Sequence, residues 1–379
     1  MKKDEFLLLP IYKQQKGKYI TKKDIVTNFP HNFNIKDYGD YEYATTSGTT
    51  SDRMEIIRKP GWWTEEYERT YSNNKKLSEY LEKKLNKVIF TTAQCSNLIC
   101  FIDKPPLEKR IIKNTLYVNN TFNPWTWTKE DIKKITEEIN YFKPYYLDAD
   151  PIYLGVYLFL KKKYNIKTKL HVPNIITLSY EFVPISVRKY IEDYFKTDIL
   201  NLYGTTEFGY LFLENEKGKM QLCKDLIDVN LLEINKEKNL YTVIIDSYKN
   251  EYMPLINYRV GDMVIATKEQ VNNFKINYEV EKMAGREKDL INGNLSCSMI
   301  DEIVSHISNI LFYQIYLISE NKCIFKYITK DNSPIVLEEQ EMLNKEFIKI
   351  GLDIDFSYSR VEEISPEMSG KFSIIKRGV

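Results

Sequence analysis

The segment DILNLYGTTEFG (198–209) gives the clearest indication of how this chain folds. Its first half is an apolar run of strand length, and Gly204 turns the chain directly afterwards. Tyr203, Thr206 and Glu207 would then lie where a strand ends, which is where open α/β sheets bind ligands. A tyrosine ring can stack on a base, a threonine hydroxyl can contact phosphate, and a carboxylate can bind Mg²⁺. A strand closed by an ordinary glycine turn fits the segment equally well.

Strand and helix patterns alternate on the amino-terminal side of this segment. A polar stretch with helical spacing covers 62–87, and further helices are expected near 128–142, 151–164 and 184–196. Between them we expect buried strands at 88–92, 115–120, 145–149, 174–179 and 199–204. This alternation predicts an α/β domain with a largely parallel sheet.

The pattern changes on the carboxyl-terminal side. Residues 209–282 form short alternating segments, which predict antiparallel strands and a β-rich subdomain. After GREKDLING (285–293) we expect a small, mobile α+β domain, with helices near 298–309 and 337–349 and strands near 313–328 and 353–359. The predicted division is therefore a large core domain, 1–283, and a small carboxyl-terminal domain, 284–379.

Composition narrows the functional class. The 379 residues suffice for two domains, and 54 Lys and Arg against 53 Asp and Glu leave a formal charge of +1, so no nucleic-acid partner is expected. The five cysteines include no C-x-x-C pair, which favours reduced thiols, and the three histidines lack metal-ligand spacing. No apolar run approaches membrane-spanning length, and the start lacks a signal sequence. We expect a soluble cytoplasmic monomer or homodimer without a membrane partner.

Four further motifs could contact a nucleotide, although each has an ordinary structural explanation. TTSGTTSDR (45–53) could hold phosphate through hydroxyls and backbone N–H groups, or be a Ser/Thr-rich turn. YRVGD (258–262) places a carboxylate that could accept from a ribose diol, or it is a hairpin turn. GREKDLING (285–293) could be a catalytic hinge or a polar linker. SGKF (369–372) contains a lysine that could be catalytic or simply solvated.

Taken together, in this order and at these separations, the motifs resemble those of the adenylate-forming enzymes, which include acyl- and aryl-CoA synthetases, luciferases and peptide-synthetase adenylation domains. Residues 178–209 are most similar to the compact phenylacetate-CoA-ligase-like branch. The resemblance covers about residues 41 to 377. It implies an AMP-forming acid ligase that uses ATP and Mg²⁺ to activate a carboxylic acid, then passes the acyl group to a thiol of coenzyme A or of a carrier-protein pantetheine.

The resemblance also implies roles for individual residues. Tyr203 would stack on adenine, and Asp262 would hold the ribose hydroxyls. Lys371 would reach the acid and the α-phosphate, and Lys288 would be the hinge. Thr206 would contact the α-phosphate, Glu207 would bind Mg²⁺, and Arg286 would help to hold the nucleotide. The remaining nucleotide contacts would come from Thr46, Ser47, Gly48, Thr49 and Thr50 of the phosphate loop and from Ser179, Tyr180, Glu181, Gly204 and Thr205.

The sequence departs from the family pattern at two places. In the phosphate loop, Ser51 replaces the second glycine and Arg53 stands near the usual lysine. After the hinge motif, Asn292, Gly293 and Asn294 occupy the position of a glycine pair that contacts the acceptor arm. These departures leave room for a third hypothesis, a catalytically degenerate member that binds nucleotide as a scaffold.

The acid is expected to bind near AQCSNLIC (93–100). This run offers the amides of Gln94 and Asn97 but no carboxylate to pair with an α-amino group, which disfavours amino acids and favours a hydroxylated aryl acid. Tyr146 could line the same pocket, as could Asp148 and Asp150. A carrier protein is the first expectation for the acceptor, and coenzyme A is the alternative.

Overall fold

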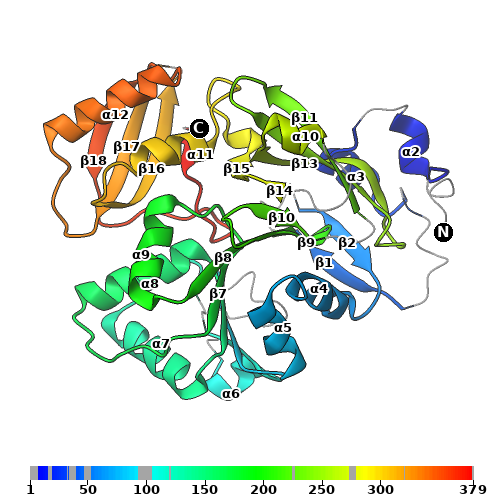
Figure 1. Cartoon of the computed structure of the whole chain (residues 1–379), viewed down its shortest axis with the longest axis horizontal. Coiled ribbons are helices and arrows are strands. Elements are labelled where there is room, and N and C mark those ends of the chain that lie inside the picture. Colours follow the sequence, from blue (N-terminus) through cyan, green and yellow to red (C-terminus); the bar gives the residue numbers. More distant parts are fainter. Residues whose placement is uncertain are drawn as a thin grey trace. The chain divides into compact units, whose positions relative to one another are not determined.

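The computed structural model describes residues 7–15, 19–31, 33, 40–46, 53–92, 105–118, 121–223, 227–272, 279–319 and 321–377. The chain forms two compact units (Figure 1). Unit 1 comprises Met1–Ser78 and Leu202–Glu287, and unit 2 comprises Glu79–Asn201 and Lys288–Val379. Strand β8 (Asp198–Thr205) contributes its first half to unit 2 and its second half to unit 1.

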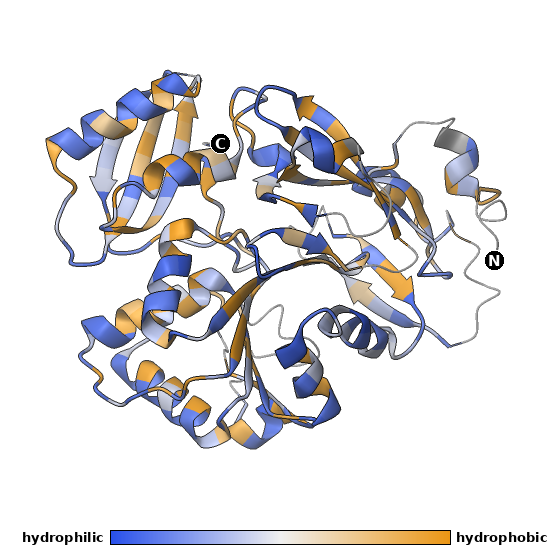
Figure 2. Ribbon diagram, viewed as in Figure 1, coloured by the Kyte–Doolittle hydropathy of each residue, from blue (hydrophilic) through white to orange (hydrophobic). Residues whose placement is uncertain are grey.

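Unit 2 contains the predicted α/β layer. Its strands lie in the order β4-β5-β3-β6-β7-β8; the last five are parallel, and β4 is an antiparallel edge strand. In Figure 2 the central strands are largely orange, in keeping with the full burial of β3, β6 and β7. The elements are β3 (Lys87–Phe90), α6 (Leu107–Arg110), β4 (Ile111–Ile112), β5 (Thr115–Tyr117), η5 (Pro124–Thr126), α7 (Lys129–Phe142), β6 (Tyr146–Ala149), α8 (Pro151–Lys163), β7 (Ile175–Leu178) and α9 (Ile185–Phe195).

Helix α8 is the central helix of this layer and packs against α7 and α9. It begins at Pro151, where the Asp150 carboxylate accepts hydrogen bonds from the backbone N–H groups of Ile152 (2.9 Å) and Tyr153 (3.1 Å). This N-cap satisfies two of the unpaired donors at the start of the helix. Eleven of the helix's residues are buried, so α8 is apolar on all sides and belongs to the core rather than to the surface.

The carboxyl-terminal segment of unit 2 is an α+β module. Its sheet has the order β18-β17-β16-β19, with β16 and β17 antiparallel and the two outer strands parallel to their neighbours. The module has its own apolar core, while Leu311, Phe312, Ile328 and Ile364 belong to the core of the α/β layer. Its elements are α11 (Cys297–Val304), β16 (Ile310–Ser319), β17 (Lys322–Thr329), α12 (Leu337–Lys349), β18 (Asp355–Arg360) and β19 (Ile375–Arg377).

Unit 1 is rich in antiparallel strands. It contains the hairpin β1–β2, the sheet β11-β12-β13-β15, and the strands β9, β10 and β14 that follow the second half of β8. The elements are α2 (Pro10–Gln15), α3 (Lys22–Asn28), β1 (Glu42–Thr45), β2 (Glu55–Arg58), α4 (Trp62–Tyr71), β9 (Gly209–Glu214), β10 (Met220–Leu222), β11 (Ile227–Asn235), β12 (Leu240–Ser247), β13 (Leu255–Ile265), α10 (Lys268–Asn272), β14 (Glu279–Val280) and β15 (Lys282–Arg286). Like β8, the elements α5 (Lys75–Glu82) and η6 (Glu287–Asp289) lie where the chain passes between the units.

The predicted fold class is confirmed: an α/β layer with parallel strands, a β-rich region, and an α+β module. Two predicted helices differ in extent. The stretch 62–87 divides into α4 and α5, because the side chain of Asn74 accepts from the N–H groups of Lys76 and Leu77 and starts a new helix. The helix expected at 298–309 ends at Val304. The division at 283/284 remains a prediction. Across the described residues, none of the helices has both the length and the apolar character of a membrane span.

Candidate functional site

The predicted nucleoside contacts meet in unit 1. Tyr203 comes from β8, Asp262 from β13 and Arg286 from β15, where Asp262 and Arg286 are directly paired across the two strands. The Tyr203 hydroxyl donates to Asp262 Oδ2 at 2.7 Å, and Arg286 Nε lies 3.7 Å from Asp262 Oδ1. Three motifs spread over 84 positions, 203 to 286, therefore supply one group of side chains. It offers an aromatic ring, a diol acceptor and a cation, which are the groups a nucleoside phosphate requires.

Burial determines the protonation state of this cluster. Loss of solvent raises the pKa of Tyr203 well above its usual range, and the neighbouring Asp262 raises it further. The phenol therefore stays protonated at neutral pH and remains a hydrogen-bond donor to the carboxylate. Asp262 is thus oriented by a fixed donor, while the side chain of Arg286 is exposed.

Thr206 and Glu207 lie in the turn that joins β8 to β9. The Thr205 hydroxyl accepts from Phe208 N at 3.1 Å and closes this turn, while the buried Tyr258 donates to Glu207 Oε1 at 3.3 Å. Burial raises the pKa of Glu207. A carboxylate that is costly to ionise in the protein alone is stabilised by a bound cation.

Glu207 fits the expected magnesium ion, although not as part of a cage of protein ligands. Among the described residues, no group of three or more His, Cys, Asp or Glu side chains gathers around a common point. Mg²⁺ at nucleotide sites is usually held by one or two carboxylates together with phosphate oxygens and water. Glu207 could supply the single hard ligand that this arrangement needs.

A buried acidic residue on α4 supports the same turn and was not identified from the sequence. Glu66 is fully buried and contacts both Lys249 and Arg69. Gly209, at φ +73°, lies against its carboxyl group, and a Cβ at this position would collide with it. The ammonium of Lys249 also lies 3.4 Å from the Phe208 carbonyl oxygen. In the sequence, Glu66 is one of several polar residues in a segment with the pattern of an exposed helix. Only its tertiary contacts show that it supports the turn between β8 and β9.

In unit 2, the structure places Lys371 in a loop that is fastened to the α/β layer. Its Nζ donates to the Tyr180 carbonyl oxygen at 2.9 Å, and the preceding residue, Gly370, accepts from the Tyr153 hydroxyl at 2.9 Å. Gly370 is buried at φ +81°, and a Cβ there would collide with the Thr92 hydroxyl. Glycine is required here both by the backbone conformation and by the close approach. Lys371 is therefore held in place, unlike a solvated terminal lysine.

Glu181 and Asp150 lie beneath this loop. Glu181 Oε2 accepts from the backbone N–H of Phe372 at 2.9 Å, and Asp150 is the N-cap of α8. Burial raises the pKa of Asp150 to about 6 and that of Glu181 well above its usual value; the charge of Asp150 raises the latter further. The resemblance placed Glu181 among the nucleotide contacts, and the sequence placed Asp150 among possible acid contacts, but neither paired the two residues.

Two further predicted nucleotide contacts, Ser179 and Tyr180, are hydrogen-bonded to a buried ion pair. Lys87 Nζ lies 2.9 Å from Asp148 Oδ2, and both side chains are buried. The Asp148 carboxylate also accepts from the hydroxyls of Ser179 (2.8 Å) and Tyr180 (3.1 Å). Tyr180 has φ +76°, an uncommon conformation for a bulky residue, and its carbonyl oxygen accepts from Lys371.

The geometry does not favour the suggested acid contact at Tyr146. This side chain is fully buried, and its hydroxyl lies 2.7 Å from the Thr177 hydroxyl. The two amides suggested as acid contacts, Gln94 and Asn97, lie outside the described residues, as do Ser47, Gly48, Thr49, Thr50 and Ser51 of the phosphate loop. Thr46 is described: it directly follows β1, and its hydroxyl accepts from Met54 N at 2.9 Å.

Lys288 lies where the chain passes from unit 1 to unit 2. Its side chain is exposed within η6, and its carbonyl oxygen accepts from Arg377 Nη1 at 2.6 Å. Arg377 also donates to the Leu290 carbonyl oxygen at 2.5 Å. The segment after the expected hinge is therefore held by the last described residue of the chain. The residues that stand in place of the family's glycine pair form a tight turn, in which Asn292 and Gly293 both have positive φ.

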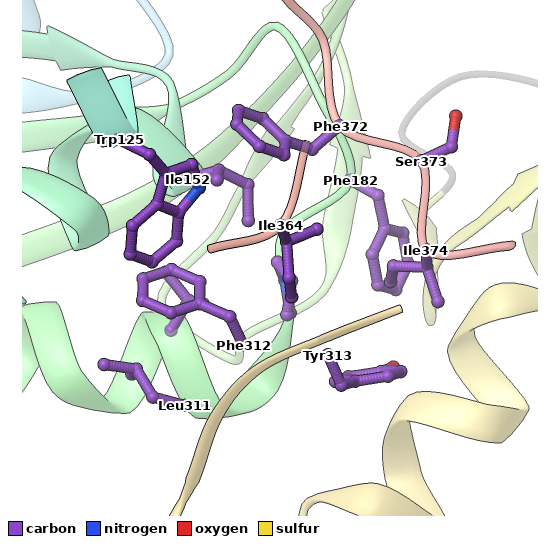
Figure 3. A pocket seen from close by; sticks show the side chains of 12 residues that line it. Trp125, Ile152, Phe182, Leu311, Phe312, Tyr313, Ile364, Phe372, Ser373 and Ile374 are labelled. Carbon is purple, nitrogen blue, oxygen red and sulfur yellow. The ribbon is translucent and has the colours of Figure 1, made fainter. Parts of the chain in front are cut away.

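A small apolar cavity adjoins the loop that carries Lys371 (Figure 3). Its volume is about 30 Å³, room for roughly two water molecules. Phe372 and Ile374 line it from the loop, Ile152 from α8, and Phe312 from the module. A cavity of this size does not hold an organic acid, so it is a packing gap rather than the acid pocket.

Comparisons with known proteins agree with the topology. No family model matches the sequence. The chain is 23% identical over 168 residues to the protein CapK of Staphylococcus aureus, and the match covers 43% of this chain and 36% of CapK. The aligned region thus spans about a third of that relative.

Several solved structures with a similar fold are ligases. A 2-hydroxyisobutyryl-CoA ligase, in the postadenylation state with R3-HIB-AMP, aligns with a TM-score of 0.67 at 12% identity, covering 100% of this chain and 83% of that protein. A benzoate CoA ligase from Burkholderia xenovorans LB400 aligns at 0.56 and 14% identity, covering 89% and 68%. An anthranilate CoA ligase in complex with anthranoyl-AMP aligns at 0.56 and 13%, covering 88% and 65%. The chain therefore has the fold of the adenylate-forming ligases.

Proposed function

We propose that this chain, with the fold of the adenylate-forming ligases, activates a carboxylic acid with ATP, releases pyrophosphate, and transfers the acyl group from acyl-AMP to a pantetheine thiol. The meeting of Tyr203, Asp262 and Arg286 in unit 1 carries the proposal. These residues come from three separate motifs, and their side chains form one group suited to a nucleoside phosphate. Arg286 is exposed and Asp262 is half-buried.

In the first half-reaction, an oxygen of the acid attacks the α-phosphorus of ATP, a P–O bond to the β-phosphate breaks, and pyrophosphate leaves. Asp262 would hold the ribose hydroxyls, with its orientation set by Tyr203, and Thr206 would contact the α-phosphate. A magnesium ion at Glu207 would neutralise phosphate charge. Lys371 would stabilise the negative charge that develops between acid and phosphate, so that positioning and electrostatics provide the catalysis.

In the second half-reaction, a thiolate attacks the acyl carbonyl and AMP leaves. We propose that the carboxyl-terminal module changes position about Lys288 between the two steps and withdraws Lys371. The loop that carries Lys371 is held by hydrogen bonds, which can break and form again when the lysine is withdrawn. Domain movement of this kind would let one site catalyse two reactions.

For the substrate we propose an aryl acid with hydroxyl groups, and for the acceptor a carrier-protein pantetheine. The acid proposal rests on the amides of Gln94 and Asn97 and on the absence of a carboxylate in 93–100. The acceptor proposal rests on Asn292, Gly293 and Asn294, which replace the usual glycine pair. Free coenzyme A is the alternative, and the similarity of fold to several CoA ligases favours it.

The test is acid-dependent exchange of labelled pyrophosphate into ATP in the presence of Mg²⁺, across benzoates, hydroxybenzoates, phenylacetates, 2-hydroxy acids, fatty acids and amino acids. Exchange with one class supports adenylation and identifies the acid. The same acid is then offered coenzyme A and a pantetheinylated carrier protein in parallel, so that thioester formation distinguishes the acceptors. Absence of exchange across the panel, with ATP binding retained in calorimetry, would favour a nucleotide-binding scaffold instead.

A further inference from the structure

Lys371 and its two neighbours in the chain are each held by a different contact. Gly370 accepts from the Tyr153 hydroxyl, Lys371 donates to a backbone carbonyl, and the N–H of Phe372 donates to Glu181 Oε2. Of these partners, Glu181 is a carboxyl group, which changes its charge in the physiological range when its surroundings shift its pKa. The contact between Glu181 and the loop can therefore depend on pH.

Two carboxyl oxygens beneath the loop are buried without a hydrogen-bond donor from the described residues. They are Asp150 Oδ2 and Glu181 Oε1, and the two side chains lie within hydrogen-bonding reach of each other. Two ionised carboxylates repel and neither can donate. One proton between them turns the contact into an O–H···O hydrogen bond and satisfies both atoms.

The surroundings indicate which residue carries the proton. Asp150 Oδ1 accepts from two backbone N–H groups at the start of α8, where the helix dipole also favours negative charge. Glu181 accepts from a single N–H, that of Phe372. The carboxylate with more donors is the more stable anion, so Asp150 is ionised and Glu181 holds the proton and donates it.

We propose that Asp150 and Glu181 share one proton and act as a positioning pair for Lys371, so that loss of this proton disengages the lysine from adenylation. The inference rests on the proposed function of Lys371. With the proton in place the pair has a single negative charge, balanced by the lysine. After its loss to solvent, two carboxylates face each other; their repulsion strains the Phe372 contact, and their added charge attracts the ammonium away from substrate.

The other ionisable groups around the pair come from several elements. Lys371 lies in the loop itself and lowers the pKa of both carboxyls by its charge. Tyr153 on α8 donates its hydroxyl to backbone carbonyl oxygens. Asp148 on β6 is already compensated by its buried ion pair with Lys87 of β3. Lys371 is thus the cation that responds when the pair changes charge.

The first experiment detects the proton directly and does not require activity. Infrared spectra of the full-length protein are recorded in the carboxylic C=O region across neutral and alkaline pH, for wild type, Glu181→Gln and Glu363→Gln. Glu363 is an exposed carboxyl in the same module and serves as the matched control. We expect a protonated-carboxyl band at neutral pH in wild type and in the control that Glu181→Gln lacks. Equal bands in all three proteins would overturn the proposal.

The second experiment measures the consequence for positioning, using pyrophosphate exchange as a function of pH. A glutamine at 181 can donate to Asp150 and accept from Phe372 but cannot ionise, so the alkaline limb should move upward by about one pH unit or more. Glu181→Ala, which removes the contact, should lower kcat about tenfold without a comparable change in the KM for ATP. Superimposable pH profiles for wild type and Glu181→Gln would refute the positioning role.

The two experiments separate this inference from the proposed function. If no acid supports exchange but the infrared band is lost in Glu181→Gln, the shared proton stands while its role in adenylation is refuted. If exchange is robust and the band is insensitive to Glu181, the enzyme is confirmed and the shared proton is refuted.

Discussion

Asp262 lies between a tyrosine and an arginine that come from two other segments of the chain. The hydroxyl of Tyr203 fixes the carboxylate, and Arg286 faces it from the neighbouring strand. An anion held by one strong donor, with a cation close by, is well oriented for a diol. At the scale of single residues, the sequence identified the three members, and the tertiary structure showed how they constrain one another.

Asp262→Asn tests this arrangement. An amide oxygen can still accept from Tyr203, but it binds hydroxyls less strongly than a carboxylate does. We expect the KM for ATP to rise about tenfold with a smaller change in kcat, measured by pyrophosphate exchange. Asp228→Asn, an exposed carboxylate on β11, is the control. An unchanged KM in Asp262→Asn would remove Asp262 from the ribose site.

Lys371→Ala tests the catalytic cation. Removing a positive charge from developing negative charge costs about 10² to 10³ in rate, so exchange should fall by at least that factor. ATP affinity by calorimetry should change little, because in this structure the ammonium donates to a backbone carbonyl oxygen. The Tm should fall, because the charge that balances the buried carboxyl pair is lost. Lys349→Ala, on the exposed face of α12, controls for loss of a surface charge. Near-normal exchange in Lys371→Ala would contradict the assigned role.

Two of the candidate site segments are loops held by close packing rather than regular elements. Residues 369–372 form no helix or strand, yet Gly370 is buried against Thr92 and Tyr153. The turn at 206–208 is similar, since Gly209 lies against the buried Glu66. At the scale of elements, each functional loop depends on a glycine that lets it approach the layer beneath.

Gly370→Ala and Gly351→Ala separate this close approach from backbone strain. Both glycines have positive φ, +81° and +90°, so alanine costs about 1 kcal/mol of conformational strain at either position. A Cβ at 351 meets no atom within 4 Å, whereas one at 370 collides with Thr92. We expect both variants to lose a few degrees in Tm, while exchange falls tenfold or more only in Gly370→Ala. Equal activities would show that the loop tolerates displacement.

At the scale of the whole molecule, the chain passes from unit 1 to unit 2 for the last time at Glu287–Lys288. Arg377 holds the backbone directly after this point, although it lies 89 residues away in sequence. The carboxyl-terminal module also supplies side chains to the core of the α/β layer. A change of position about Lys288 would therefore require that this packing be released.

Lys288→Pro tests the hinge. Proline fixes φ at 288 and restricts Glu287, so a rotation through this residue should be impeded. We expect thioester formation to slow about tenfold relative to adenylation, with the two half-reactions assayed separately in rapid-quench experiments. Lys288→Ala removes the same side chain but leaves the backbone free, and its ratio should match wild type. A similar change in both variants would indicate a side-chain effect instead.

The sequence by itself determined the order of the elements and the identity of the nucleotide-binding candidates. Local periodicity predicted α12 at 337–349 and the strands around DILNLY, because burial on one face imposes a repeat that can be read along the chain. Tyr203 and Asp262 were candidates because each lies beside a glycine at the expected end of a strand, and the resemblance to the adenylate-forming enzymes implied their roles.

Tertiary structure alone decided which side chains act together. Asp150 and Glu181 are 31 positions apart, and Glu66 lies 143 positions before Gly209, so no local repeat links either pair. Tyr146 shows the reverse: the sequence suggested it as a possible acid contact, but the folded chain buries it in the layer. Partnerships between distant residues depend on how layers pack, and that information is distributed over the whole chain rather than held in any one motif.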